Sequence, residues 1–141
     1  MQGNNDLMNN IDVKRVISPV SVADTTAQVG QVIDGRGANS ITYLIATGSI
    51  ADADATFTVL LEESDESGAN FSAVADADLL GTEALAGFQF DDDNECRKLG
   101  YIGSKRYTRL TITPAGNASA ALLCAVCVLG SQLAPTANPP A

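Results

Sequence analysis

The chain has 141 residues, of which 45% are hydrophobic, and 17 acidic against 8 basic side chains give it a formal net charge of −9. This length suits one domain with a single core. The sequence has no His, the side chain most often used for proton transfer near neutral pH. No spacing brings together a nucleophile, a base and an orienting group. We therefore expect a domain that binds other protein surfaces, that is not an enzyme, and that has no cofactor.

Neither end of the chain predicts export or insertion into a membrane. The polar start Met1 to Asp6 lacks the basic and apolar regions of a secretion signal. The longest apolar run, Ala120 to Leu129, is about half the length of a membrane-spanning helix. We expect a soluble protein that is made in the cytoplasm and does not bind membranes.

Short segments rich in β-branched and aromatic residues, separated by turn residues, predict strands along most of the chain. Phe57, Val59 and Leu61 share one face of such a segment, so this face should point into the core. The polar segment 63–70 has the composition of a surface loop. The predicted strands are 11–17, 29–33, 40–46, 56–62, 84–90, 99–102, 106–113 and 121–129.

About eight closely spaced strands without a convincing helix predict an all-β fold, an antiparallel β-sandwich of the jelly-roll or Ig-like type. The sandwich should occupy residues 11–130, between a flexible N-terminal arm at 1–10 and a Pro-rich C-terminal tail at 131–141. The last strand, 121–129, is apolar on both faces, which predicts that it is covered on both sides.

Charge is distributed unevenly along the chain. Residues 37–96 hold thirteen acidic and no basic side chains, whereas residues 97–109 hold five of the eight basic ones. The acidic stretch would repel phosphates, so we expect no nucleic-acid partner. A polarised protein-binding module fits this pattern better.

Two features resemble metal sites and are explained more simply. Cys124-x-x-Cys127 lies in an apolar strand, where residues three apart point to opposite faces, so we expect free thiols at Cys96, Cys124 and Cys127. The acidic segments 51–54, 75–78 and 91–93 are reminiscent of calcium ligands but lack EF-hand spacing. We expect solvated loops there and no bound metal.

The stretch from Val16 to Gly116 resembles the head decoration or minor capsid (cement) proteins of tailed bacteriophages. The residues that carry the resemblance are ISPVSVADTTAQVGQVIDGRGANSITYLIATGSIADADATFTVLLEESDESGANFSAVADADLLGTE and KLGYIGSKRYTRLTITPAGN. The resemblance implies a virion structural protein with a β-sandwich core on the outside of the capsid. It further implies the major capsid protein as partner, a homo-oligomer with a trimer favoured, and no catalytic role.

Two sets of residues are candidates for contacts in such an assembly. The basic residues Lys98, Lys105, Arg106 and Arg109 are candidates for meeting an acidic capsid surface, and internal pairing with residues 91–95 is the alternative. The candidate subunit interface consists of Leu122, Cys124, Val126 and Val128, unless this strand lies in the core of its own domain.

Other functions remain open at this stage. A carbohydrate-binding module, or a fibre or tail module of the virion used in attachment, could have the same fold, although sugar sites usually need exposed aromatic rings. A calcium-stabilised adhesin is a third possibility.

Overall fold

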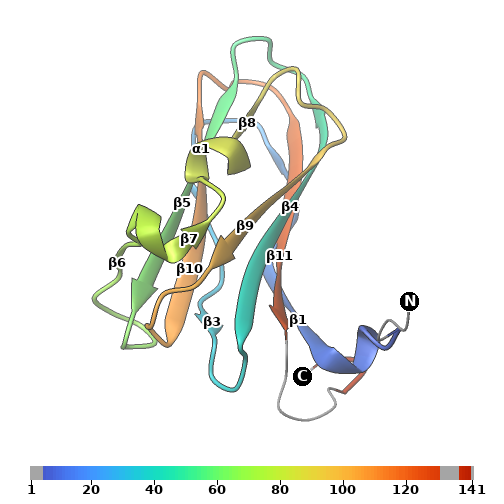
Figure 1. The fold of residues 1–141 in the computed structure, drawn as a ribbon. Helices are drawn as coiled ribbons and strands as arrows, with labels where there is room; N and C mark the ends of the chain where they lie inside the picture. Colours follow the sequence, from blue (N-terminus) through green and yellow to red (C-terminus); the bar gives the residue numbers. More distant parts are fainter. Residues whose placement is uncertain (1–4, 131–136, 141) are drawn as a thin grey trace.

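The computed structural model describes residues 5–130 and 137–140, and its strands form two antiparallel sheets (Figure 1). Sheet A has the strand order β1 (Ile11–Val22), β11 (Ala121–Gly130), β4 (Ser40–Ile50), β9 (Cys96–Tyr101) and β7 (Leu79–Leu80). Sheet B has the order β2 (Gln28–Val29), β10 (Tyr107–Ala115), β5 (Thr56–Ser64) and β6 (Ser72–Ala73). Two further short strands join sheet B, β3 (Ile33–Asp34) beside β10 and β8 (Phe88–Gln89) beside β5.

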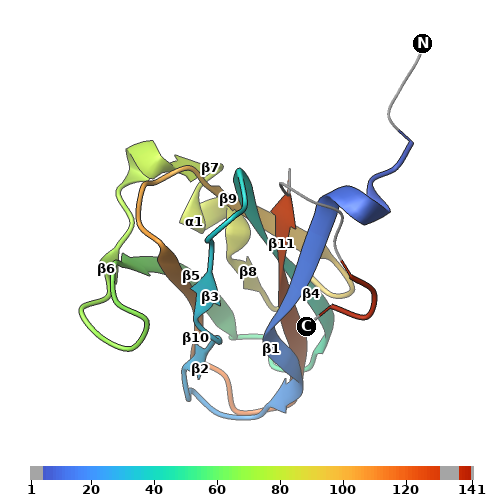
Figure 2. The same ribbon diagram turned by 90° about the horizontal axis from the view of Figure 1, so that it is seen from below.

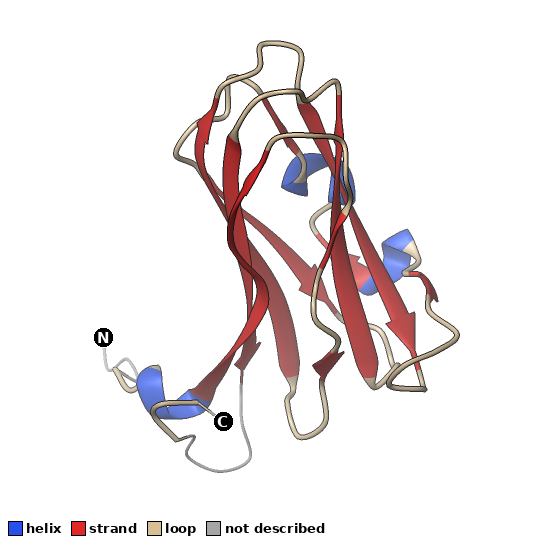
Figure 3. Cartoon of the chain, turned by 180° about the vertical axis from the view of Figure 1, so that it is seen from behind, coloured by secondary structure: helices blue, strands red, loops and turns tan. Residues whose placement is uncertain are grey.

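The sandwich predicted from the sequence is confirmed, and its connections are those of a jelly roll. The chain passes from one sheet to the other between β1 and β2, between β3 and β4, between β4 and β5, and again from β9 through β10 to β11. Apart from β1 and β4, which both lie in sheet A, consecutive long strands lie in different sheets, as in the double Greek key of a jelly roll. The helical elements are short: η1 (Met8–Asn10), η2 (Asp76–Asp78) and α1 (Glu83–Ala86) (Figure 3).

The core lies between the two sheets, seen end-on in Figure 2. Alternation along the strands places its residues: Phe57, Val59 and Leu61 of β5 are buried, as the sequence predicted. One polar contact crosses the core, where the hydroxyl groups of Tyr43 in β4 and Thr108 in β10 lie 2.6 Å apart. Both residues are fully buried.

Two predicted strands differ in the structure. The segment 84–90 forms α1 and then β8, because the side chain of Thr82 accepts a hydrogen bond from the Leu85 N–H and caps the helix. The segment 29–33 is divided into β2 and β3. At the break the Gly30 N–H bonds to Leu110 of sheet B, and the next N–H, of Gln31, bonds to Val16 of sheet A.

The edge strand β1 is irregular. Its pairing with β11 shifts register between Arg15 and Ile17 and again between Ile17 and Val20, and Pro19 lies within the second shift. A bulge adds local twist to a strand, and Pro has no N–H for a ladder. The outer edge of β1 is consequently an interrupted set of hydrogen-bonding groups.

The prediction that β11 is covered on both sides is wrong for a single subunit. Its inward residues, among them Leu123, Ala125 and Cys127, are buried, but the alternate set is half-buried or exposed. Among the described residues, sheet B is stacked on one face of β11, and the second face is the outside of the sandwich.

The two ends of the chain are described in part. Within the predicted N-terminal arm, Asp6 accepts hydrogen bonds from Asn9, and η1 follows. Residues 1–4 of this arm and residues 131–136 and 141 of the predicted tail lie outside the described residues. None of the helices in residues 5–130 and 137–140 has the length and apolar character needed to cross a membrane.

Candidate protein-binding site

Three of the four candidate basic residues are paired within the fold. Lys105 bonds to Asp65, and Arg106 makes a two-pronged contact with Asp34 at 2.9 and 2.8 Å. Arg106 also holds the pKa of the Asp34 carboxyl below its usual range, because the guanidinium donates to the charged form. These acids come from distant parts of the chain and not from the segment 91–95, with which internal pairing was the predicted alternative.

Arg109 is the most enclosed of the three. It donates to Glu62 on the neighbouring strand at 3.0 and 2.7 Å, and its guanidinium lies over the Phe71 ring at 4.3 Å from the centroid. These contacts use its charge inside the fold. Its availability to a partner is therefore reduced.

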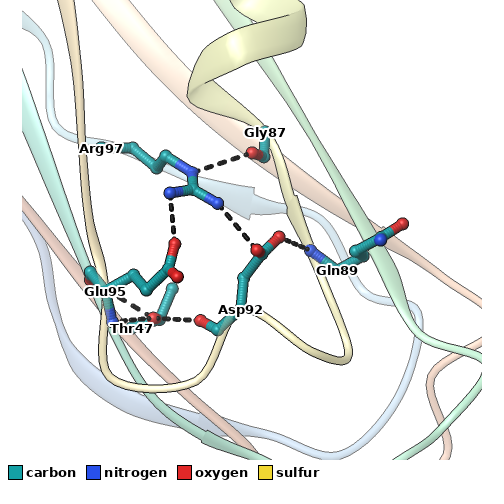
Figure 4. Close-up of polar contacts among 6 residues, drawn as sticks. All are labelled: Thr47, Gly87, Gln89, Asp92, Glu95 and Arg97. Atoms are coloured by element: carbon teal, nitrogen blue, oxygen red, sulfur yellow. Dashed lines mark hydrogen bonds and ion pairs between the residues drawn. The ribbon is translucent and has the colours of Figure 1, made fainter.

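Arg97, which sequence reasoning passed over, makes the contacts with segment 91–95 (Figure 4). It donates to the Gly87 carbonyl at 3.3 Å, pairs with Asp92 at 2.9 Å, and also pairs with Glu95. The Thr47 hydroxyl donates to the Asp92 carbonyl and accepts from the Glu95 N–H. The Arg97 cluster thus fastens the acidic loop to β4 and has a structural role.

Lys98 differs from the other three candidates. It is exposed, and it forms no ion pair with any described residue. Register pairs it with Leu44 of β4, whose side chain points out of the sandwich. Lys98 therefore lies on the outside of sheet A.

The outer face of sheet A is apolar over four strands. Its centre consists of the residues proposed for the subunit interface, Leu122, Cys124, Val126 and Val128, which the structure places side by side on the outside of β11. The flanking strands add Val13, Thr42, Leu44, Ala46, Gly48, Cys96, Lys98 and Gly100, with Leu80 of β7 beside Gly100 and Arg15 on β1. We call this set the sheet A face, and no carboxylate belongs to it.

Gly48 shapes the sheet A face beside Leu122. A Cβ on Gly48 would lie 2.8 Å from the Leu122 Cβ, so the missing side chain lets Leu122 lie over β4. Beside it, a hollow of about 240 Å³ is lined by Pro19, Cys124 and Ala46 among others. An apolar partner side chain would find both a ridge and a recess here.

One cross-strand row on this face carries two cations. The register joins Arg15 of β1 to Val126, then to Leu44, and then to Lys98 of β9. Three strand spacings separate the outer two residues, which is about 14 Å. Arg15 donates to the Ser18 hydroxyl and, like Lys98, has no ion pair among the described residues.

Two of the acidic segments, 51–54 and 91–93, serve the fold. Asp52 accepts hydrogen bonds from the N–H groups of Asp54 and Ala118, which lowers the pKa of its carboxyl. Asp93 accepts from the Ile50 N–H. Among residues 5–130 and 137–140, no three His, Cys, Asp or Glu side chains converge into a group that could hold a metal ion.

The three thiols are free, as expected. Cys127 points into the core, where burial raises the pKa of its thiol to about 12, whereas Cys124 is half-buried on the sheet A face. The two therefore lie on opposite sides of β11, which the strand period predicted.

A cleft of about 640 Å³ lies beside α1, between this helix, β5 and β8. The Phe57 and Phe88 rings at its base stack on each other with centroids 4.7 Å apart, and both are buried. The polar side chains at its rim include Arg97 and Asp92, which are paired with each other. The cleft therefore offers few unpaired charged groups.

No protein-family model and no curated protein matches the sequence. Among solved structures, the PBSX exported protein XepA is similar with a TM-score of 0.55 and 16% identity, over 93% of this chain and 40% of that chain. The CBM22-1-GH10 modules of the Clostridium thermocellum xylanase 10B are similar with a TM-score of 0.46 and 10% identity, over 92% of this chain and 28% of that chain. A Bacillus endospore appendage protein is similar with a TM-score of 0.41 and 10% identity, over 92% of this chain and 96% of that chain.

These similarities bear on the fold only. The similarity to XepA supports the sandwich fold. The chain spans less than half the length of either of the first two proteins.

Proposed function

We propose that the protein is a virion structural protein that binds the outside of a phage capsid and stabilises the shell through protein contacts. The sheet A face is the observation that carries the proposal, since this apolar surface of the sandwich is left uncovered by residues 5–130 and 137–140. The largest apolar patch on a typical monomeric protein covers about 300–600 Å² and often marks an interaction site.

The resemblance of residues 16–116 to head decoration proteins supplies the partner. The major capsid protein is that partner in the proposal, and the protein acts as a homo-oligomer, with a trimer favoured, and without a cofactor. Its action is mechanical and not catalytic. Binding to assembled shells but not to their dissociated subunits stabilises the assembly by mass action.

The test uses phage heads that lack the protein. Purified protein is added, bound protein is measured by sedimentation, and the heads are heated until they release their contents. Saturable binding together with a higher release temperature supports the proposal. Binding without added resistance would replace stabilisation with a decorating or attachment role, and absence of binding would refute the proposal.

Carbohydrate recognition is the alternative that the fold leaves open. The cleft beside α1 has room for a sugar. Its aromatic rings are buried against each other and provide no flat exposed platform, which weakens this alternative. A glycan array tests it directly, because specific binding there would move the function from the shell to attachment.

A further inference from the structure

We propose that the sheet A face binds a partner surface whose apolar centre is flanked by two carboxylates, and that a second copy of this chain does not occupy it. The inference rests on the proposed function and adds which surface makes the contact and which chemistry the partner presents. It combines Lys98, a candidate for capsid contact, with the residues first considered for a subunit interface.

The row Arg15, Val126, Leu44 and Lys98 defines the pattern that the partner must match. Leu44 is 37% exposed, so contact with an apolar side chain would remove it from water. The two cations lie about 14 Å apart on either side, at the distance set by three strand spacings. Carboxylates at a similar separation on a partner would neutralise both while the aliphatic side chains pack between them.

The charges argue against a second copy stacked face to face. Such a pair would bring two Arg15 and two Lys98 side chains into one interface, with sheets about 10 Å apart and no carboxylate on either face. The face is also small for a stable homodimer. About 19 Å across the strands from β1 to β7 and about 20 Å along β11 give roughly 400 Å², against about 800 Å² per partner in a standard interface.

The sheet A face and the whole chain carry net charges of opposite sign. The chain has a net charge of −9, yet this face holds two cations and no carboxylate. An acidic partner would be repelled by most of the surface and attracted here, so charge would orient the encounter. Lys105, Arg106 and Arg109 cannot give this orientation as readily because each already has an acidic partner.

The experiment compares the binding of four variants to heads that lack the protein. Leu44→Asp is matched by Leu60→Asp on the outside of sheet B, because the two leucines are 37% and 38% exposed in the long strands β4 and β5. Lys98→Glu is matched by Lys105→Glu, which makes the same change in net charge. Thermal melting of each variant verifies that it is folded.

We expect Leu44→Asp and Lys98→Glu to weaken binding at least tenfold, and Leu60→Asp and Lys105→Glu to leave it within about twofold. Lys98→Glu should also reduce the loss of binding on addition of salt. Equal binding by the wild type, Leu44→Asp and Lys98→Glu would overturn the inference and leave the proposed function standing. No binding by the wild type would remove both.

Sedimentation velocity of the free protein tests whether a second copy of this chain binds the sheet A face. We expect Leu44→Asp to leave the oligomeric state of the wild type unchanged. An oligomer that Leu44→Asp dissociates, while Leu60→Asp leaves it intact, would assign the face to a second copy and overturn the inference.

Discussion

The hydroxyl pair between Tyr43 and Thr108 should make stability depend on both groups together. The two oxygens lie 2.6 Å apart in the core, and both residues are fully buried. Tyr43→Phe leaves the Thr108 hydroxyl without its partner, and Thr108→Val does the same to Tyr43. A buried polar group without a hydrogen bond costs about 1–3 kcal/mol, whereas replacing both partners by apolar groups of the same shape is nearly neutral.

We therefore expect each single variant to lose about 2 kcal/mol of unfolding free energy and the double variant to lose less than either. In urea, with a slope of about 2 kcal/mol per M, each single loss moves the midpoint down by about 1 M. Circular dichroism of the four proteins at neutral pH measures this cycle. If the loss in the double variant equals the sum of the two single losses within about 0.5 kcal/mol, the coupling across the core is refuted.

Three further outcomes follow from side chains inside the sandwich and its loops. Burial raises the pKa of the Cys127 thiol from 9.0 to about 12. The contribution of this thiol to the free energy of unfolding is therefore complete below about pH 9. It is lost as the pH rises toward 12, at up to about 1.4 kcal/mol per pH unit. Urea unfolding at about pH 8 and about pH 10 should show this fall in the wild type and a smaller one in Cys127→Ala; equal falls would contradict it. Arg97→Met should cost about 2 kcal/mol because it breaks three contacts, while Lys105→Met, which removes an exposed pair, should cost less than about 0.5 kcal/mol in the same assay. Millimolar calcium should leave the melting temperature unchanged relative to a chelator, because Asp52, Asp92 and Asp93 already accept hydrogen bonds from the backbone N–H groups of Ala118, Gln89 and Ile50; a clear rise would support a calcium site.

Local pattern sufficed for the long strands because alternation and turn residues act over a few positions. Phe57, Val59 and Leu61 were assigned to the core from their spacing, and all three are buried. The helix at Glu83–Ala86 was missed because it is four residues long and depends on the Thr82 cap, a signal that a strand-like composition hides.

Pairing partners could not be predicted in the same way. Arg106 meets Asp34 across 72 positions of sequence, and Arg109 meets Glu62 across 47. Proximity in sequence favoured the acids at 91–95, but strand register determines which charges meet. For the same reason, the alignment of Arg15 with Lys98 across β11 and β4 became visible only in the folded sheet.

The irregular edge of β1 matters for a protein that is proposed to bind a capsid as a homo-oligomer. A regular free edge would present a row of N–H and C=O groups to which a neighbouring copy could add its own strand, and growth of that kind has no natural end. The two register shifts and Pro19 interrupt this row. On the opposite sheet, the Glu83 carboxylate accepts the Leu61 N–H at the edge of β5 and occupies a donor that another strand would need. At these two edges, a neighbouring copy therefore does not find a regular row of groups to which it could add a strand.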